Sequence, residues 1–227
     1  PSADQDQAAL AQIRASQAVG QLIVFCTQSS DPNPATRQGK PIGDCQQALL
    51  DQNLHHLVIT LLRTQLRHPA KGLVDNNRRE HLALLSYRLL RFMVEGNISH
   101  ALHLSRYVPF LTSCLDRQPE VIETLSAVFK DNLQILKDTK SFNVSCHLSQ
   151  CPAPQFLQRL LQKTNQCELR YVEFLGELCV CKGMGVPTNQ DFIWRHLSVR
   201  PDILLASRMV DGELQLFISE TQLQSIL

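Results

Sequence analysis

Apolar residues recur every three or four positions along most of the chain, which is the pattern of amphipathic helices. Loops rich in Pro, Gly, Asn and Asp separate the apolar stripes. In the N-terminal half we predict helices over residues 8–27, 44–67 and 77–94, the second of them interrupted at 51–53. Asp44, and Asn76 or Asn77, are placed to cap the second and third helices. Residues 1–9 are predicted to be a flexible N-terminal segment.

The second half of the chain carries shorter stripes. We predict short helices over residues 100–104, 108–115, 119–129, 132–138, 156–161 and up to Leu205. Leu214, Leu216 and Ile218 then alternate with other residues, which is the period of a strand. The helical domain is therefore assigned to residues 10–210, and residues 211–227 to an exit segment or the start of the next module.

Residues 171–197 are predicted to form two helices joined by a tight break. A stripe at helical spacing predicts the buried face of the first helix, namely Leu169, Val172, Leu175 (or Gly176) and Cys179. Gly176 falls on the same face, and a glycine inside a helix is typical of close packing by a neighbouring helix.

The break between these two helices has its own local signals. Lys182 places a positive charge at the C-terminus of the first helix, and Gly183 is free to adopt a positive φ. Pro187 suits the first position of the second helix, where its missing N–H costs nothing. The expected inner face of the second helix consists of Phe192, Ile193 and Leu197.

The fold class that follows is all-α. Consecutive helices that cannot bury their apolar faces alone favour an armadillo-like stack of antiparallel helices, a helical repeat superhelix. A compact orthogonal bundle is the alternative, because the sequence shows no strict repeat period.

Length and composition exclude few functions. The 227 residues suffice for one large domain or two small ones, with 44% apolar and 19% charged residues. A net charge of +1 gives no indication of a nucleic-acid partner. No apolar run approaches the ~20 residues of a membrane helix, and the N-terminus does not resemble a signal peptide. We expect a soluble piece of a larger protein.

The eight cysteines are expected to be reduced thiols rather than disulfides, because Cys26 and Cys179 fall on apolar helical faces and no secretory signal precedes them. Cys179 and Cys181 are too close for a zinc pair. Cys146, His147 and Cys151 are neighbours, but prolines follow them, and we do not assign a metal there. No nucleophile motif, phosphate loop or metal-protease motif is present, so we expect neither an enzyme nor a cofactor.

The run LCVCKGMGVPTNQDFI, residues 178–193, resembles the hallmark segment of the RIH domain, which inositol trisphosphate receptors and ryanodine receptors share. Positions that fit the motif include Cys179, Gly183, Pro187, Asn189 and Gln190. The resemblance extends over residues ~10–210 through Leu50-Asp51-Gln52-Asn53-Leu54, Tyr87-Arg88-Leu89-Leu90-Arg91 and Asp202-Ile203-Leu204.

This resemblance implies a domain of the cytosolic assembly of a tetrameric calcium-release channel in the endoplasmic or sarcoplasmic reticulum. The implied partners are the other domains and subunits of a homotetramer, with calcium as the ion conducted by the parent protein. The membrane would be met only through that parent protein.

In inositol trisphosphate receptors the corresponding domain supplies basic ligands for the trisphosphate. Carried onto this sequence, those positions hold neutral residues: Gly43, Gln47, Leu50, Asn97, Ile98 and Ser99. A polyphosphate requires several converging cationic donors, so we expect no such binding here. Leu50 is expected to pack inward or against a neighbouring domain. Arg37 and Lys40 in the preceding loop are the remaining candidate ligands.

Three hypotheses follow. The first is a regulatory and structural module of a calcium-release channel, which passes movement between domains toward the pore. The second is a helical-repeat module that binds a partner peptide in a concave groove. The third is an inositol-phosphate-binding domain that uses Arg37 and Lys40.

Overall fold

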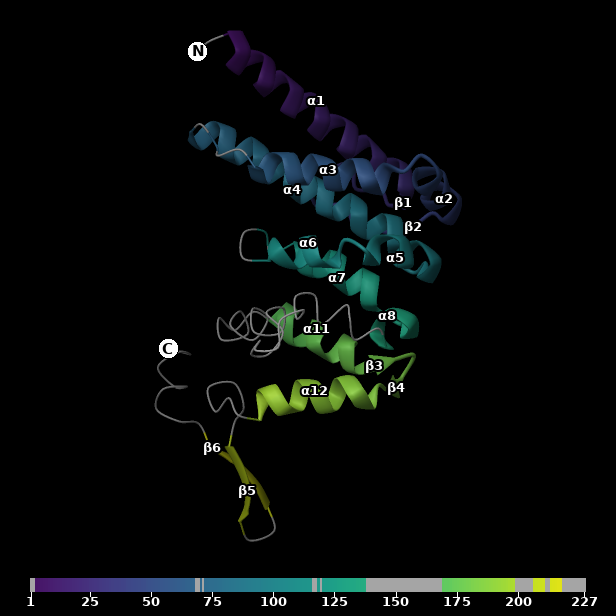
Figure 1. The fold of residues 1–227 in the computed structure, drawn as a ribbon, viewed down its shortest axis with the longest axis vertical. Coiled ribbons are helices and arrows are strands. Elements are labelled where there is room, and N and C mark those ends of the chain that lie inside the picture. The colour runs from purple at the N-terminus through teal and green to yellow at the C-terminus, as the bar shows by residue number, and fades with distance from the viewer. Residues whose placement is uncertain are drawn as a thin grey trace, which may run out of the picture. The chain divides into compact units, whose positions relative to one another are not determined.

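The computed structural model describes residues 3–67, 70, 72–115, 118, 120–137, 169–198, 206–210 and 213–217 (Figure 1). The chain divides into two compact units, residues 1–135 and 136–227. The described residues are mostly helical, which confirms the all-α prediction. The domain predicted over residues 10–210 extends across both units.

Unit 1 contains seven helices and a short antiparallel pair of strands in its described residues. The helices are α1 (Ala3–Cys26), α2 (Gly43–Asp51), α3 (Leu54–Arg67), α4 (Leu73–Val94), α5 (Ile98–Ser105), α6 (Val108–Ser113) and α7 (Val121–Phe129). Strands β1 (Thr27–Gln28) and β2 (Lys40–Pro41) pair where the loop 29–39 leaves and returns. Helix α8 (Leu133–Lys137) crosses the boundary between the units.

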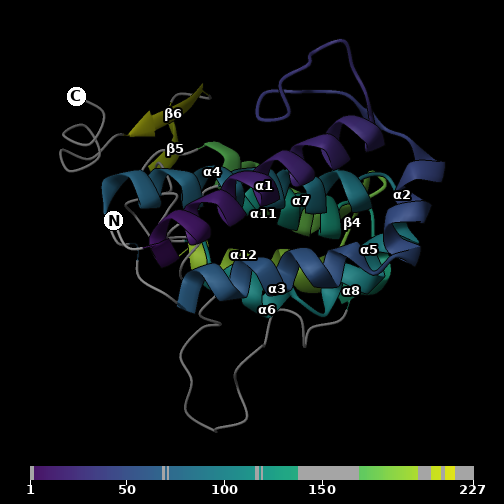
Figure 2. The same cartoon turned by 90° about the horizontal axis from the view of Figure 1, so that it is seen from above.

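Helix α4 is the centre of unit 1. It packs against α1, α3 and α7. Figure 1 shows α1 on one side of α4 and α7 on the other, and Figure 2, seen from above, shows α1 in front of α4. Every residue from Leu85 to Leu90 is buried, so its C-terminal half has no solvent face. A helix buried all round is expected in the core of a stack rather than on its surface.

Three helix starts differ from the prediction. Helix α1 begins at Ala3 instead of residue 8, and α4 begins at Leu73 instead of residue 77. Leu73 and Val74 are exposed, so the first turn of α4 adds nothing to a buried apolar stripe. The cap of α2 is Ile42 rather than Asp44, because strand β2 leads directly into that helix. Asp44 lies in the first turn, where a carboxylate still favours the helix dipole.

The breaks between helices match the prediction. Asn53 separates α2 from α3 with a φ of 55°, and Gly96 ends α4 with a φ of 74°. Asn97 caps α5, because its side-chain oxygen accepts from the backbone N–H of His100 at 3.1 Å. The apolar residues that recur at helical spacing in α7 are all buried: Val121, Ile122, Leu125, Val128 and Phe129.

Unit 2 contains a helical hairpin and a strand hairpin in its described residues. Helices α11 (Leu169–Cys179) and α12 (Pro187–Leu197) are joined by the two-residue strands β3 (Val180–Cys181) and β4 (Met184–Gly185). The predicted strand is β6 (Glu213–Phe217), and its antiparallel partner β5 (Ala206–Val210) was not predicted. The predicted helices at 156–161 and up to Leu205 lie outside the described residues.

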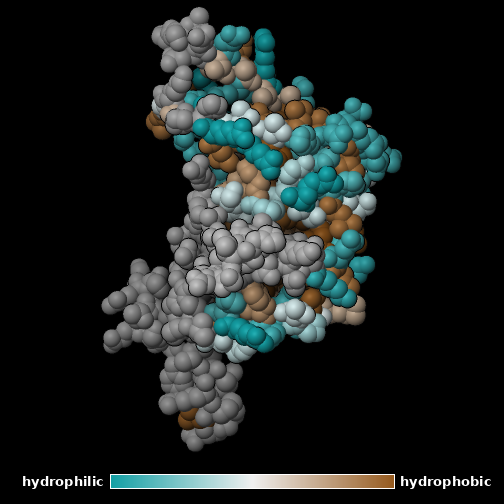
Figure 3. Space-filling view, viewed as in Figure 1, coloured by the Kyte–Doolittle hydropathy of each residue, from teal (hydrophilic) through white to brown (hydrophobic). Residues whose placement is uncertain are grey.

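The surface of unit 1 is mixed. Figure 3 shows apolar residues exposed in patches between hydrophilic ones, rather than one continuous apolar face. In the described part of the chain, no helix combines the length and hydropathy needed to cross a bilayer.

Candidate functional site

The α11–α12 hairpin is closed by a tight turn at Lys182 and Gly183. Both residues have positive φ, 50° and 76°, and they connect the paired strands β3 and β4. Two consecutive positive φ angles are typical of the two-residue turns that match the twist of a strand pair. Pro187 occupies the first turn of α12, as predicted.

Asn189 holds the two helices of the hairpin together. Its side chain is 4% exposed, and its amide nitrogen donates to the carbonyl oxygen of Leu178 at 2.9 Å and to that of Leu136 at 3.1 Å. Carbonyls in the last turn of a helix have no partner within the helix, so this amide satisfies a group that α11 leaves open. Gln190, the next motif residue, is exposed and lies against Gly185.

The buried face of α11 differs from the predicted one. Val172 is 51% exposed, Cys179 is half-buried, and a Cβ added at Gly176 would meet no atom within 4 Å. The prediction that Gly176 packs against a helix is therefore wrong. Leu175, which the predicted stripe included, is buried, and the other buried residues are Tyr171, Phe174 and Leu178. Apart from Leu175, this stripe is offset by one position from the predicted one, and two aromatic residues mark it.

Arg37 fastens the loop 29–39 to the end of α1. It is 5% exposed, and its guanidinium donates to the hydroxyl and carbonyl oxygens of Thr27 at 2.7 and 2.8 Å and to the carbonyl of Asp31. A guanidinium that is buried and bonded to carbonyls within the fold is not presented to a ligand. These contacts give Arg37 a structural role and do not favour it as a phosphate ligand.

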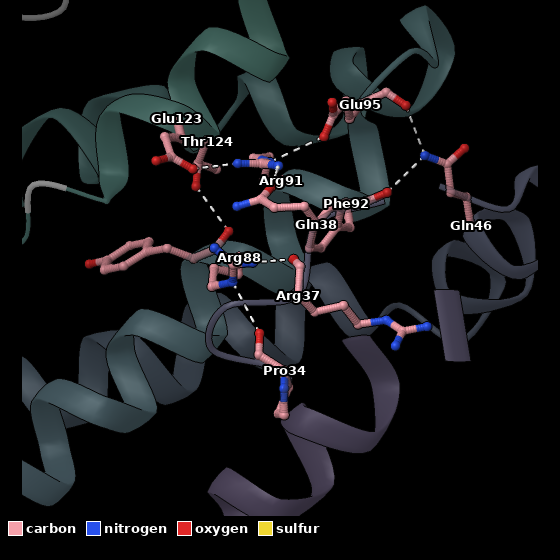
Figure 4. Close-up of polar contacts among 11 residues, drawn as sticks. Pro34, Arg37, Gln38, Gln46, Arg88, Arg91, Phe92, Glu95, Glu123 and Thr124 are labelled. Atoms are coloured by element: carbon pink, nitrogen blue, oxygen red, sulfur yellow. Dashed lines mark hydrogen bonds and ion pairs between the residues drawn. The ribbon is translucent and has the colours of Figure 1, made fainter. Parts of the chain in front are cut away.

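Arg88 joins the same loop to α4. Its guanidinium donates to the carbonyl oxygen of Pro34 at 3.1 Å and to the carbonyl of Arg37 (Figure 4). The side chain is 8% exposed, and burial together with the nearby Arg91 lowers its pKa. A guanidinium stays protonated at physiological pH despite such a shift, so these hydrogen bonds are charge-assisted.

Arg91 connects α4 to three other segments. It forms ion pairs with Glu95, at 3.1 Å, and with Glu123 of α7, and it donates to the side chain of Gln38 at 3.4 Å (Figure 4). Thr124, beside Glu123, donates to the carbonyl oxygen of Tyr87 at 3.0 Å. We call Arg37, Arg88, Arg91, Glu123 and Thr124 the arginine network. It links the loop after α1, the central helix and α7.

The positions that the resemblance assigns to trisphosphate ligands come together in one corner of unit 1. The side-chain oxygen of Gln47, on α2, lies 3.0 Å from the imidazole Nε2 of His100 and accepts its hydrogen bond; His100 is one residue after Ser99. Gln46 donates to the carbonyl oxygens of Phe92 and Glu95, at 2.8 and 3.0 Å, and so fixes α2 on the end of α4. The two segments are therefore neighbours, and the six residues in question are neutral: Gly43, Gln47, Leu50, Asn97, Ile98 and Ser99.

The side chains in this corner are only partly available to a ligand. Gly43, Gln47 and Ile98 are exposed, whereas Leu50 is half-buried. Lys40 is exposed on β2 and Asp44 on the first turn of α2. One exposed lysine does not make the converging set of cations that a polyphosphate needs.

The described cysteines are free thiols: Cys26, Cys45, Cys114, Cys179 and Cys181. Burial raises the pKa of the Cys26 thiol to about 12, and it also raises that of Cys179. A protonated thiol is a poor nucleophile. Among the described residues no cluster of His, Cys, Asp and Glu is arranged to hold a metal ion, and Cys146, His147 and Cys151 lie outside those residues.

Sequence reasoning did not find the arginine network. In the sequence analysis, Arg88 and Arg91 appeared only as part of a family motif, and Arg37 appeared only as a candidate ligand. A signal was present in the sequence, because Arg88 stands in an apolar stretch between Leu85 and Leu89, where an arginine requires partners if the stretch is buried. Identifying those partners in the loop 29–39 required the three-dimensional structure.

Two comparisons with known proteins show what this chain is similar to. Residues 17–209 match the family model of the RIH domain. The chain is 25% identical over 218 residues to the inositol 1,4,5-trisphosphate receptor-like protein A of Dictyostelium discoideum. That match covers 94% of this chain and 6% of that much longer protein.

Proposed function

This chain belongs to the RIH domain family, and on that premise we propose that it is a cytosolic regulatory and structural module of a tetrameric, ligand-gated calcium-release channel. Its task in the parent protein is to pass movement between neighbouring domains toward the pore. The match to the RIH domain over residues 17–209 carries this proposal. RIH domains occur in channel proteins and are not an enzyme family.

The arginine network supports a role in transmitting movement. A module that passes on displacement must move as a rigid body, and loops that detach from it would absorb the displacement instead. Arg88 and Arg91 fix the loop after α1 and the helix α7 to the same stretch of α4. Unit 1 is thereby held by charge-assisted hydrogen bonds in addition to apolar packing.

We assign the module to residues 10–210, with residues 1–9 as a leading segment and 211–227 as the exit toward a following module. Its partners are the other domains and subunits of the same homotetramer, at the cytosolic face of the endoplasmic or sarcoplasmic reticulum. Calcium is the ion conducted by the parent protein. Within the RIH hallmark we assign Cys179, Gly183, Pro187, Asn189 and Gln190 to the structure of the α11–α12 hairpin.

The proposal is tested on the full-length parent protein in a planar bilayer. We expect a calcium-permeable channel whose open probability falls several-fold with Arg91→Gln, which removes the contacts to α7 and to the loop. The matched control is Arg195→Gln, which removes an exposed ion pair within α12 and should leave gating unchanged. A full-length protein that carries no cation current contradicts the proposal.

Inositol trisphosphate is not the ligand of this module in our proposal, because the six assigned positions are neutral. Calorimetry on a longer stretch of the parent protein that includes the preceding domains should show no binding in the micromolar range at physiological salt. Micromolar binding that is lost in the double variant Arg37→Gln, Lys40→Gln would instead favour the inositol-phosphate alternative. Binding of a partner peptide without any channel activity would favour the helical-repeat interaction module.

A further inference from the structure

A groove lies on unit 1 between α1 and the N-terminal half of α4, with the loop residues 32–34 at one end. Its volume is about 1020 Å³. The residues that carry the argument are Ile13, Gly20, Val24, Val74, Arg78 and His81. The groove meets the arginine network only at Pro34, whose carbonyl accepts from Arg88, and none of the five residues of that network lines it.

The walls of the groove are apolar and open to solvent. Ile13 and Val24 on α1 are 41% and 40% exposed, and Val74 on α4 is 63% exposed. Leu10, 46% exposed, extends the same stripe of α1 by one turn. Between Leu10 and Val24 the helix rises by roughly 21 Å, which is the length of about four helical turns. An apolar strip of this length between two helices is a place where a third helix packs.

A glycine lets the loop close the groove at one end. Gly20 is buried, and a Cβ added there would lie 3.0 Å from Cγ of Pro34. The backbone of α1 and the ring of Pro34 are therefore in close contact. The open part of the groove lies between this contact and the N-terminal turns of α1 and α4.

Arg78 carries the one formal charge among the described residues that line the groove, and this charge is positive. Arg78 is half-buried on α4, and His81 follows one turn later on the same side of that helix. None of the described residues that line the groove is acidic, and within the described residues Arg78 has no recorded ion pair. An occupant with carboxylates on the side facing α4 would complement this edge.

We propose that this groove binds an amphipathic helix of a partner protein, with its apolar face on Ile13, Val24 and Val74 and an acidic flank beside Arg78 and His81. This interaction goes beyond the proposed channel function and does not depend on it. Burial of exposed apolar side chains provides the affinity. The positive charge of Arg78 selects an acidic helix over a basic one.

The test uses two labelled synthetic peptides of about 18 residues, long enough to span the strip. Both carry leucines at helical spacing. One has glutamates along its flank and the other has lysines. By fluorescence anisotropy with the 227-residue chain, we expect the glutamate peptide to bind at least about tenfold more tightly at low salt. The difference should shrink near 1 M salt, where the screening length is about 3 Å.

Variants of exposed residues locate the binding surface. Val74→Glu should weaken binding of the glutamate peptide about tenfold, and Arg78→Glu should reverse the preference in favour of the lysine peptide. Val172→Glu, at an apolar residue of α11 that is 51% exposed, is the matched control and should change neither affinity. Far-ultraviolet circular dichroism and melting temperatures verify that each variant is folded.

Two outcomes overturn the proposal. The first is equal binding of both peptides to the wild-type chain and to Arg78→Glu, because charge would then select nothing. The second is recruitment to phosphatidylserine vesicles that requires Arg78, with no binding of the glutamate peptide. That result would assign the groove to an anionic membrane surface instead of a protein helix.

Discussion

Unit 1 and unit 2 hold their helices together by different means. Among the described residues of unit 1, ten polar or charged side chains are buried, and they include Arg37, Arg88 and His55. In the described residues of unit 2, Asn189 is the one buried polar side chain. Unit 1 must accommodate a long loop that returns to its own helices, whereas the hairpin of unit 2 closes within six residues, 180–185.

The difference shows how connection length determines the kind of interaction that stabilises a helix pair. A short turn satisfies its own backbone groups through local hydrogen bonds and positive φ angles. A long loop lying on a helix carries carbonyl groups that need donors from elsewhere. Arginines supply several donors from one side chain, which explains why they are buried at Arg37 and Arg88 rather than exposed.

The largest expected effect comes from Arg88→Leu. This change leaves the carbonyls of Pro34 and Arg37 without their buried donor, and each unsatisfied group costs roughly 1–3 kcal/mol. We expect the free energy of unfolding to fall by about 3 kcal/mol, measured by urea denaturation. The loop 29–39 should also become the first site of limited proteolysis.

A matched control separates this effect from the loss of any arginine. Arg195→Leu removes an exposed pair with Asp191 on α12, and such pairs contribute about 0–1 kcal/mol. If the two arginine variants lost equal stability, the arginine network would not distinguish unit 1 from unit 2.

Asn189→Leu tests the corresponding fastening in unit 2. The change leaves the carbonyl oxygens of Leu178 and Leu136 without a donor, and we expect a loss of about 2 kcal/mol. Thr188→Ala at the neighbouring exposed position is the control and should change stability by less than about 0.5 kcal/mol. Thermal melts of both variants provide the measurement. If Asn189→Leu were as stable as the wild-type chain, the turn at Lys182 and Gly183, rather than Asn189, would hold α11 and α12 together.

Two glycines of the same hairpin should respond to alanine in opposite directions. Gly183 has a φ of 76°, where an L-residue costs roughly 1–2 kcal/mol, so Gly183→Ala should destabilise the chain. Gly176 lies in α11 with open space around it, so Gly176→Ala should stabilise the helix by up to about 1 kcal/mol. Urea denaturation of the two variants compares them directly. If Gly176→Ala destabilised the chain, this would support close packing of a neighbouring helix on Gly176, which the structure does not show.

The contrast between short connections and long loops also determines how much of the fold could be predicted from the sequence. The helix pairs joined by short breaks were predicted correctly, because Asn53, Gly96, Gly183 and Pro187 signal a break through their own backbone preferences. The helix starts at Ala3 and Leu73 were missed, because exposed first turns carry no apolar period. The face of α11 was missed by one position, because its small and β-branched residues fit two neighbouring stripes.

The candidate site was predictable only in part. The neutral character of the corner around Gln47 and Asn97 follows from residue identity alone, but the contact between its two segments is a long-range one. The role of Arg37 could not be predicted, because an arginine in a loop is usually exposed, and its partners here are backbone carbonyls. No residue type marks a carbonyl that needs a donor.

The smallest expected effect is a pH dependence that belongs to unit 1. His55 of α3 is 6% exposed, its Nδ1 has no hydrogen-bond partner among the described residues, and the rings of His103 and Tyr107 lie 6.3 and 6.2 Å away. Burial, followed by the charges of His103 and Arg106, lowers the pKa of His55 below its ordinary value of 6.5. The unfolded chain therefore binds more protons than the folded chain at pH values just below 6.5.

The sign of the effect follows from this difference in proton binding. The stability that neutral His55 contributes is fully present above pH 6.5 and is lost as the pH falls below that value toward the lowered pKa. Urea denaturation at a series of pH values should show this decline for the wild-type chain and a shallower one for His55→Gln, whose side chain does not titrate. His55→Phe fills the same space without a polar atom, and its stability should show the same shallow dependence on pH as that of His55→Gln. If the free energy of unfolding depended on pH in the same way for all three proteins, the buried imidazole would not be what makes unit 1 sensitive to acid. The contrast between the two units would then rest on the arginines alone.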